Sequence, residues 1–177
     1  GGAIVDNHLL LGKDGNAAEV GHFTLDLKER LKCGCGKRGC WEANCSGRNI
    51  PNFVELKINE DYGGKFDGSL LHDLTDGDIS NLDSKTFFEA VKSEDELAQE
   101  IMDQINHYNT IGFSILVDAY DPSLITAGGS VILKNEDQIL PHIRENLEKH
   151  IRNRPPEIKI TPLGDEIGLY GAIASVI

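Results

Sequence analysis

All four cysteines of the 177-residue chain lie between positions 33 and 45, a clustering that restricts how this part of the chain can fold. Cys33, Cys35 and Cys40 form a Cys-x-Cys-x4-Cys pattern, and His22 precedes them. Structural zinc sites use four tetrahedral sulfur and nitrogen ligands. Three glycines within 33–40 would let the backbone turn tightly enough for the thiolates to converge on one ion. The pattern therefore predicts a zinc-binding loop, with free or loosely paired thiols as the alternative.

The position of the cysteines also indicates the cellular compartment. A cluster favours a metal site in a reducing compartment over a disulfide framework, whose cysteines would be spread along the chain. We therefore expect a cytoplasmic protein. Cys45 follows the pattern in what reads as the next helix, and we interpret it as a buried free thiol rather than a ligand.

Charge excludes several classes of partner. The chain has 17 Lys and Arg against 29 Asp and Glu, a formal net charge of -12. An acidic surface repels phosphate backbones and anionic lipid, so we expect no nucleic-acid partner for this segment. We also expect no membrane partner, because no apolar stretch approaches the roughly 20 residues that cross a bilayer.

Hydrophobic periodicity predicts alternating strands and helices, which favours an α/β layered fold. Residues 59–83 are rich in Asp, Gly, Asn and Ser and predict an exposed connection or an insertion. The remaining expected elements are a hairpin over 3–5 and 8–11, strands over 23–25, 124–127 and 157–161, and helices over 94–120, 136–152 and 165–177.

Two motifs together carry a family resemblance. Ala18-Glu19-Val20-Gly21-His22, followed by Cys33-Gly-Cys-Gly-Lys-Arg-Gly-Cys40-Trp41-Glu42, resembles the signature of the ROK family (repressors, open reading frames and kinases). The resemblance spans nearly the whole chain, is weakest over 51–83, and is greatest to archaeal glucokinase-like members.

The resemblance implies a fold and a domain organisation. Members have the RNase H-like fold of actin-like ATPases and sugar kinases, with two lobes around a cleft. Residues 1–177 would be the C-terminal lobe, with a sugar and zinc loop over 15–48 and an adenosine-binding turn near 121–131. The chain has no initiator Met and opens mid-strand, so we expect a piece of a longer protein that lacks its N-terminal lobe. The family's catalytic aspartate would lie upstream, so the chain alone should be inactive.

The resemblance also implies the ligands of the site. The zinc ligands would be His22, Cys33, Cys35 and Cys40. Glu19, His22 and Glu42 would contact the hydroxyls of a sugar ring. Carboxylates suit this role because they accept hydrogen bonds from neighbouring hydroxyls.

A nucleotide site is implied at two glycine turns. Gly1 and Gly2 resemble the end of a phosphate-binding turn, where backbone N–H groups can approach phosphate oxygens. Gly128, Gly129 and Ser130 resemble the adenosine-binding turn. The cofactors implied are ATP and Mg²⁺, besides structural Zn²⁺.

The function implied is an ATP-dependent hexose kinase, glucokinase-like, that forms a homo-oligomer. The alternative is a sugar-responsive transcriptional regulator of the same family. A third reading, a zinc-stabilised interaction module without a sugar site, stays open on sequence grounds.

Overall fold

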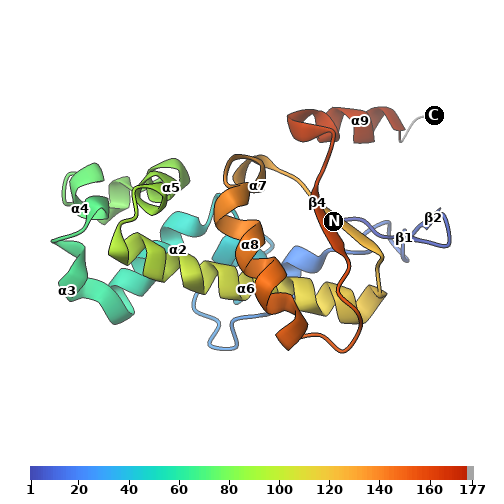
Figure 1. Ribbon diagram of the computed structural model, residues 1–177, viewed down its shortest axis with the longest axis horizontal. Helices are drawn as coiled ribbons and strands as arrows, with labels where there is room; N and C mark the ends of the chain where they lie inside the picture. Colours follow the sequence, from blue (N-terminus) through green and yellow to red (C-terminus); the bar gives the residue numbers. More distant parts are fainter. Residues whose placement is uncertain (175–177) are drawn as a thin grey trace.

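The computed structural model describes residues 1–174, and the long helix α6 runs through the middle of it (Figure 1). Helices α2 to α5 lie at one end of α6, and the strands lie toward the other end. The strands are β1 (Ile4–Val5), β2 (His8–Leu9), β3 (Leu124–Ala127) and β4 (Glu157–Ile160). The α-helices are α1 (Trp41–Cys45), α2 (Ile50–Lys57), α3 (Gly63–Phe66), α4 (Leu70–Leu74), α5 (Ser84–Lys92), α6 (Glu96–Tyr120), α7 (Ser130–Lys134), α8 (Glu136–Asn146) and α9 (Ile167–Ala174). A π-helix spans Ile58–Tyr62, and 3₁₀ turns span Val20–His22, Ile79–Asn81, Leu147–Lys149 and Gly164–Glu166.

Helix α6 confirms the long helix that the periodicity predicts. The Asp95 carboxylate accepts a hydrogen bond from the Ala98 backbone N–H, which satisfies one of the unpaired donors of the first turn. The helix ends at Tyr120, and the next residue, Asp121, has a left-handed backbone (φ 44°) directly before Pro122. Its apolar face forms the core together with α2, α5 and α8, and the residues that α6 buries there include Leu97, Ile101 and Ile105.

The two pairs of strands confirm the predicted hairpin and the α/β character. β1 and β2 pair in antiparallel fashion, and the turn residues Asp6 and Asn7 both have positive φ, as a tight hairpin requires. β3 and β4 are parallel, with Leu124 opposite Glu157 and Ala127 opposite Ile160. Helices α7 and α8 lie between them in sequence, which makes a β-α-β crossover.

The connection predicted over residues 59–83 is not an irregular exposed loop, because this stretch is largely helical. It contains most of the π-helix, α3, α4 and a 3₁₀ turn, and it buries Phe66, Leu71 and Leu82 in the core. These apolar residues are too widely spaced among Asp, Gly and Ser to produce a helical period. Short helices that pack on α5 and α6 therefore read as a polar connection.

Smaller differences concern the ends of elements. The strand expected over 23–25 is reduced to a single bridge between Thr24 and Cys40. The helix expected over 136–152 ends at Asn146 and continues as a 3₁₀ turn to Lys149. The last helix covers Ile167–Ala174; residues 165–166 of the expected 165–177 helix belong to the preceding 3₁₀ turn, and residues 175–177 lie outside the described part. Among residues 1–174, no helix is long and apolar enough to cross a membrane.

Candidate metal and sugar site

The loop that carries the cysteines is shaped by backbone hydrogen bonds rather than by regular secondary structure. The carbonyl of Gly39 accepts hydrogen bonds from the N–H groups of Leu25 and Asp26, at 2.9 and 3.0 Å. Cys33 donates its N–H to the carbonyl of Lys37 at 2.8 Å. Gly39 has a φ of +74°, and a Cβ at this position would overlap the carbonyl oxygen of Asp26. Glycine is therefore required here for the two arms of the loop to approach each other.

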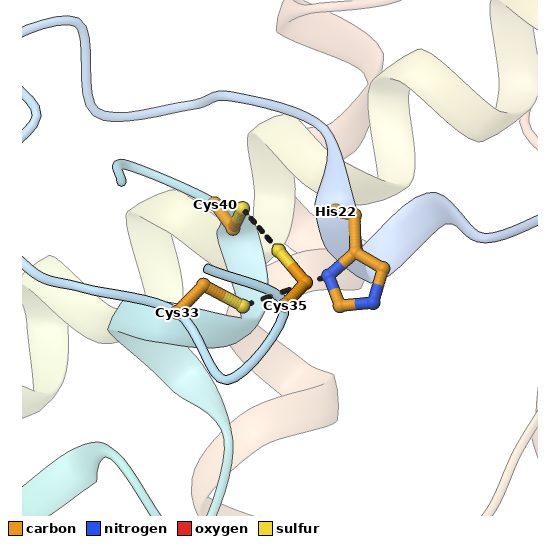
Figure 2. Close-up of side chains that lie close together, drawn as sticks. All are labelled: His22, Cys33, Cys35 and Cys40. Carbon is orange, nitrogen blue, oxygen red and sulfur yellow. Dashed lines mark hydrogen bonds between the residues drawn. The ribbon is translucent and has the colours of Figure 1, made fainter. Parts of the chain in front are cut away.

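This loop brings the four predicted metal ligands together (Figure 2). The ligand atoms of His22, Cys33, Cys35 and Cys40 all lie within 4.8 Å of one another. The Sγ atoms of Cys35 and Cys40 are 3.8 Å apart, and Sγ of Cys33 is 3.6 Å from Nδ1 of His22. Four ligands placed tetrahedrally around zinc at about 2.3 Å would be separated by about 3.8 Å. The two printed separations lie close to this value, so the arrangement fits a zinc ion.

The electrostatics of the thiols also suit a cation. Cys33 and Cys40 are buried, whereas Cys35 is exposed. Burial, together with the neighbouring thiols, raises the pKa of Cys40 to about 12, while the backbone N–H of Lys37 lowers the pKa of Cys35. Zinc deprotonates the thiols that coordinate it, and its positive charge would compensate the thiolates packed around it.

The two carboxylates predicted to bind the sugar flank the metal cluster. Glu19 directly precedes the 3₁₀ turn Val20–His22, and its Oε2 lies 3.6 Å from Nε2 of His22. Glu42, in the first turn of α1, places Oε1 3.9 Å from Sγ of Cys33. The side chain of His22 thus has Nδ1 toward the cysteines and Nε2 toward Glu19. Glu19 thus contacts the cluster at His22, and Glu42 contacts it at Cys33 and lies beside the backbone of Gly21.

A tryptophan between a metal ligand and a sugar-site candidate anchors α1 to α6. Nε1 of Trp41 donates a hydrogen bond to Oδ1 of Asn109 at 2.9 Å, and its ring meets Phe113 edge-on. The indole lies directly over Gly112, where a side chain would collide with it. Sequence reasoning did not identify Asn109 or Gly112, since nothing in the sequence links them to a loop that far upstream.

The glycines predicted to bind nucleotide line a cavity of about 1410 Å³. Gly1 and Gly2 contribute to one side of it, and Gly128, Gly129 and Ser130 contribute from the end of β3 and the start of α7. Gly129 has a φ of +100°, so the turn favours glycine at this position. Glu19, His22 and Glu42 lie outside this lining, and Trp41 lies on it.

Cys45 is separate from the metal cluster, as predicted, although it is half-buried rather than buried. Its Sγ donates to the carbonyl of Ile105 at 3.7 Å, and burial raises the pKa of its thiol.

The β-α-β unit, the long central helix and the His–Cys₃ loop define a lobe of the sugar-kinase class. The sequence profile described as "ROK family" matches residues 1–177, so the chain belongs to the ROK family. The predicted family and the α/β sugar-kinase lobe are thereby confirmed.

Individual relatives are mostly named as kinases. The glucokinases of Pyrobaculum calidifontis and Aeropyrum pernix are each 34% identical over 98% of this chain, and the matches cover 52% and 54% of those proteins. A crystal structure of a ROK family glucokinase from Streptomyces griseus, in complex with glucose and AMPPNP, superposes with a TM-score of 0.79 at 30% identity. It matches 98% of this chain and 55% of its own length. The xylose repressor of Bacillus subtilis is more distant, at 25% identity over 85% of the chain. The chain thus spans about half the length of the glucokinases it matches.

Proposed function

We propose that the intact protein is an ATP-dependent hexose kinase that acts on glucose or a closely related hexose in the cytoplasm. Residues 1–177 would form its C-terminal lobe, with the sugar and zinc loop over 15–48 and the adenosine-binding turn near 121–131. The observation that carries the proposal is the His–Cys₃ cluster with Glu19 beside its His22 and Glu42 beside its Cys33. Glucokinases are the named relatives that match this chain at 30–34% identity.

Zinc would be a structural element of this site. His22, Cys33, Cys35 and Cys40 would hold the ion, which has no free coordination position when it is bound to four protein ligands. The ion would cross-link a loop that is not part of any β-sheet. Coordination through Nδ1 of His22 would fix the ring so that Nε2 faces Glu19 and the sugar.

Glu19 and Glu42 would select the sugar. A carboxylate that accepts hydrogen bonds from two neighbouring hydroxyls rejects an analogue that lacks one of them, because its buried oxygen is then left unpaired. Glu42 is half-buried beside Cys33, and Glu19 is about half exposed. Glu42 is therefore the carboxylate whose position is more firmly fixed by the folded loop.

The nucleotide would bind along the large cavity. Backbone N–H groups at Gly1 and Gly2 would meet phosphate oxygens, and Gly128, Gly129 and Ser130 would meet the adenosine. The Streptomyces griseus relative was crystallised with AMPPNP, which supports ATP as the phosphoryl donor. Mg²⁺ would accompany ATP, since phosphoryl transfer depends on neutralising its charge. The catalytic aspartate and the N-terminal lobe would lie in the half of the relatives that this chain does not cover.

The test is phosphorylation by the intact protein, loaded with zinc and supplied with ATP and Mg²⁺, across a panel of hexoses. Turnover on one or two sugars would establish the kinase and name its substrate. Sugar binding without any turnover would contradict the kinase and favour the alternative, a sugar-responsive regulator of the same family. This alternative is supported by the similarity of the chain to two xylose repressors.

Substitutions separate the sugar ligands from the metal ligands. Glu42→Ala should weaken hexose binding, measured by calorimetry, while the zinc content of the intact protein stays at one per chain. His22→Ala should lose both, because this side chain serves both groups. Glu55→Ala is the matched control, since Glu55 is an exposed helical glutamate on α2. A Glu42→Ala protein with normal hexose affinity would refute the role of Glu42.

A further inference from the structure

A buried carboxylate lies at the start of the metal loop, the segment from Asp26 to Cys40 that carries the three cysteine ligands. Both of its oxygens are hydrogen-bonded. Asp26 is only 3% exposed. Its Oδ1 accepts from the N–H of Lys28 at 3.1 Å and from Nη2 of Arg30 at 3.3 Å. Its Oδ2 accepts from the backbone N–H and from Nε of Arg30, at 3.1 and 3.0 Å. The Asp26 carboxylate thus pairs with the Arg30 guanidinium through both oxygens, which is the strongest geometry available to this pair.

The Arg30 guanidinium also donates hydrogen bonds to two elements that are distant in the sequence. Its Nη1 donates to Oε2 of Glu60 in the π-helix at 2.8 Å, and its Nη2 donates to the hydroxyl of Tyr108 on α6 at 3.1 Å. Glu60 also faces Lys57, whose Nζ pairs with Asp61. The guanidinium therefore joins the loop to two helical segments that lie far away in the sequence.

The segment that contains Asp26 and Arg30 also forms the hydrogen bonds that close the metal loop. The backbone carbonyls of Glu29 and Arg30 accept hydrogen bonds from the Arg38 side chain, and the carbonyl of Leu31 accepts from the N–H of Gly39 at 3.0 Å. The N–H of Asp26 in turn reaches the carbonyl of Gly39. Segment 26–31 is thus the stretch of backbone to which Arg38 and Gly39, the two residues before Cys40, are hydrogen-bonded.

The charge balance of the pair favours its ionised form. Burial alone would raise the pKa of the Asp26 carboxyl, but the hydrogen bonds from Arg30 and from the N–H of Lys28 outweigh it and hold that pKa below its ordinary value. The hydrogen bond to Asp26 likewise raises the pKa of Arg30. Removal of one partner would leave an uncompensated charge in a largely buried position.

We propose that Asp26 and Arg30 are positioning residues for the zinc site: their bidentate pair, tied to Tyr108 and Glu60, holds the metal loop against α6 in its binding geometry. The inference rests on the proposed zinc site and deepens it. The loop has two isolated bridges but no regular helix or strand between residues 23 and 40, so the pair pre-organises the converging thiols before the ion binds. The kinetic stability of the bound ion then depends on residues that do not touch it.

The experiment is zinc release from the intact protein into excess chromophoric chelator, comparing Asp26→Asn with the unmutated protein. Asn keeps the size of the side chain but replaces one acceptor with an NH₂ group that faces N–H donors, and it removes the charge that Arg30 pairs with. We expect zinc release to become faster by about 10-fold or more. Asp95→Asn is the matched control, because Asp95 is also a carboxylate that accepts two backbone N–H bonds, from Leu70 and Ala98.

A purely structural role predicts a different pattern. Release would then follow the melting temperature, and Asp95→Asn would accelerate it as much as Asp26→Asn does for the same loss of melting temperature. Arg30→Lys should give an intermediate rate, since a lysine retains the charge but not the fork of donors. Tyr108→Phe removes only the hydroxyl from the network and should give the smallest increase, which keeps the test decisive if Asp26→Asn does not fold.

The outcomes distinguish this inference from the function on which it rests. One zinc per unmutated chain, with release unchanged in Asp26→Asn, Arg30→Lys and Tyr108→Phe, would overturn the positioning role and leave the zinc site standing. An unmutated protein purified without zinc, and unable to take it up, would overturn both.

Discussion

Gly112 lies where helix α6 passes beneath the Trp41 indole, and replacing it with alanine tests how tightly the sugar and zinc loop is packed. A Cβ at Gly112 would lie 2.5 Å from both Cδ2 and Cζ2 of Trp41, closer than carbon atoms approach in proteins. The ring cannot move away freely, because it is hydrogen-bonded to Asn109 and packed edge-on against Phe113. The collision is with a held aromatic ring rather than with the end of a flexible side chain.

Two opposing effects decide the sign of the change. Gly→Ala in the middle of a helix ordinarily stabilises by about 1 kcal/mol, because alanine loses less backbone entropy on folding. Overpacking of a core costs about 1–3 kcal/mol, and loss of the Trp41–Asn109 hydrogen bond would cost about 1 kcal/mol more. We therefore expect Gly112→Ala to lower the free energy of unfolding by about 2 kcal/mol.

The assay is urea denaturation of the intact protein, followed by circular dichroism. Gly64→Ala is the control, since Gly64 lies in α3 and a Cβ there meets nothing within 4 Å. The same substitution should be neutral or stabilising at Gly64 and destabilising at Gly112. A Gly112→Ala protein that unfolds at the same or a higher urea concentration than the unmutated protein would show that Trp41 does not pack on α6 as described.

Two further predictions concern zinc binding and the stability of the fold at low pH. Cys35→Ser should lower zinc content, measured by mass spectrometry, and thermal stability together; unchanged metal stoichiometry would contradict its assignment as a ligand. Asp83 caps α5 through the N–H of Thr86, which holds the pKa of its carboxyl below the ordinary value. Its stabilisation is therefore present above the unfolded-state pKa of about 3.9 and is lost as pH falls through the folded-state pKa. Asp83→Ala should cost about 1 kcal/mol at pH 7 and less at pH 3 by urea denaturation, and an undiminished cost at pH 3 would argue against a charged cap.

The parts of the fold that the sequence predicted are those whose signals are local. The spacing of Cys33, Cys35 and Cys40 on a glycine-rich stretch is a property of adjacent residues, and the structure places their sulfur atoms together. Helix α6 has both an apolar period and a stop signal at Asp121-Pro122, so its extent was predicted to within two residues. The hairpin likewise depends on a two-residue turn.

The parts that it did not predict depend on contacts between distant segments. Leu71 and Phe66 are buried in the same core as residues of α5 and α6, yet their neighbours in sequence are mostly polar. The pairing of Arg30 with Glu60 and Tyr108 joins three segments with no shared motif. Such contacts are set by tertiary packing, which neither the hydrophobic period nor the local motifs encode.

Helix α6 emerges as the scaffold that sets the geometry of the proposed sugar site. Tyr108 and Asn109 are adjacent, Gly112 follows about one turn later, and all three meet the segment that carries the metal ligands. Tyr108 holds the start of the metal loop through Arg30, while Asn109 and Gly112 hold its end through Trp41. A loop without a sheet of its own is therefore fixed at both ends on one rigid helix. A change on this face of α6 should alter Glu42 and the metal cluster together, although no residue of α6 belongs to either.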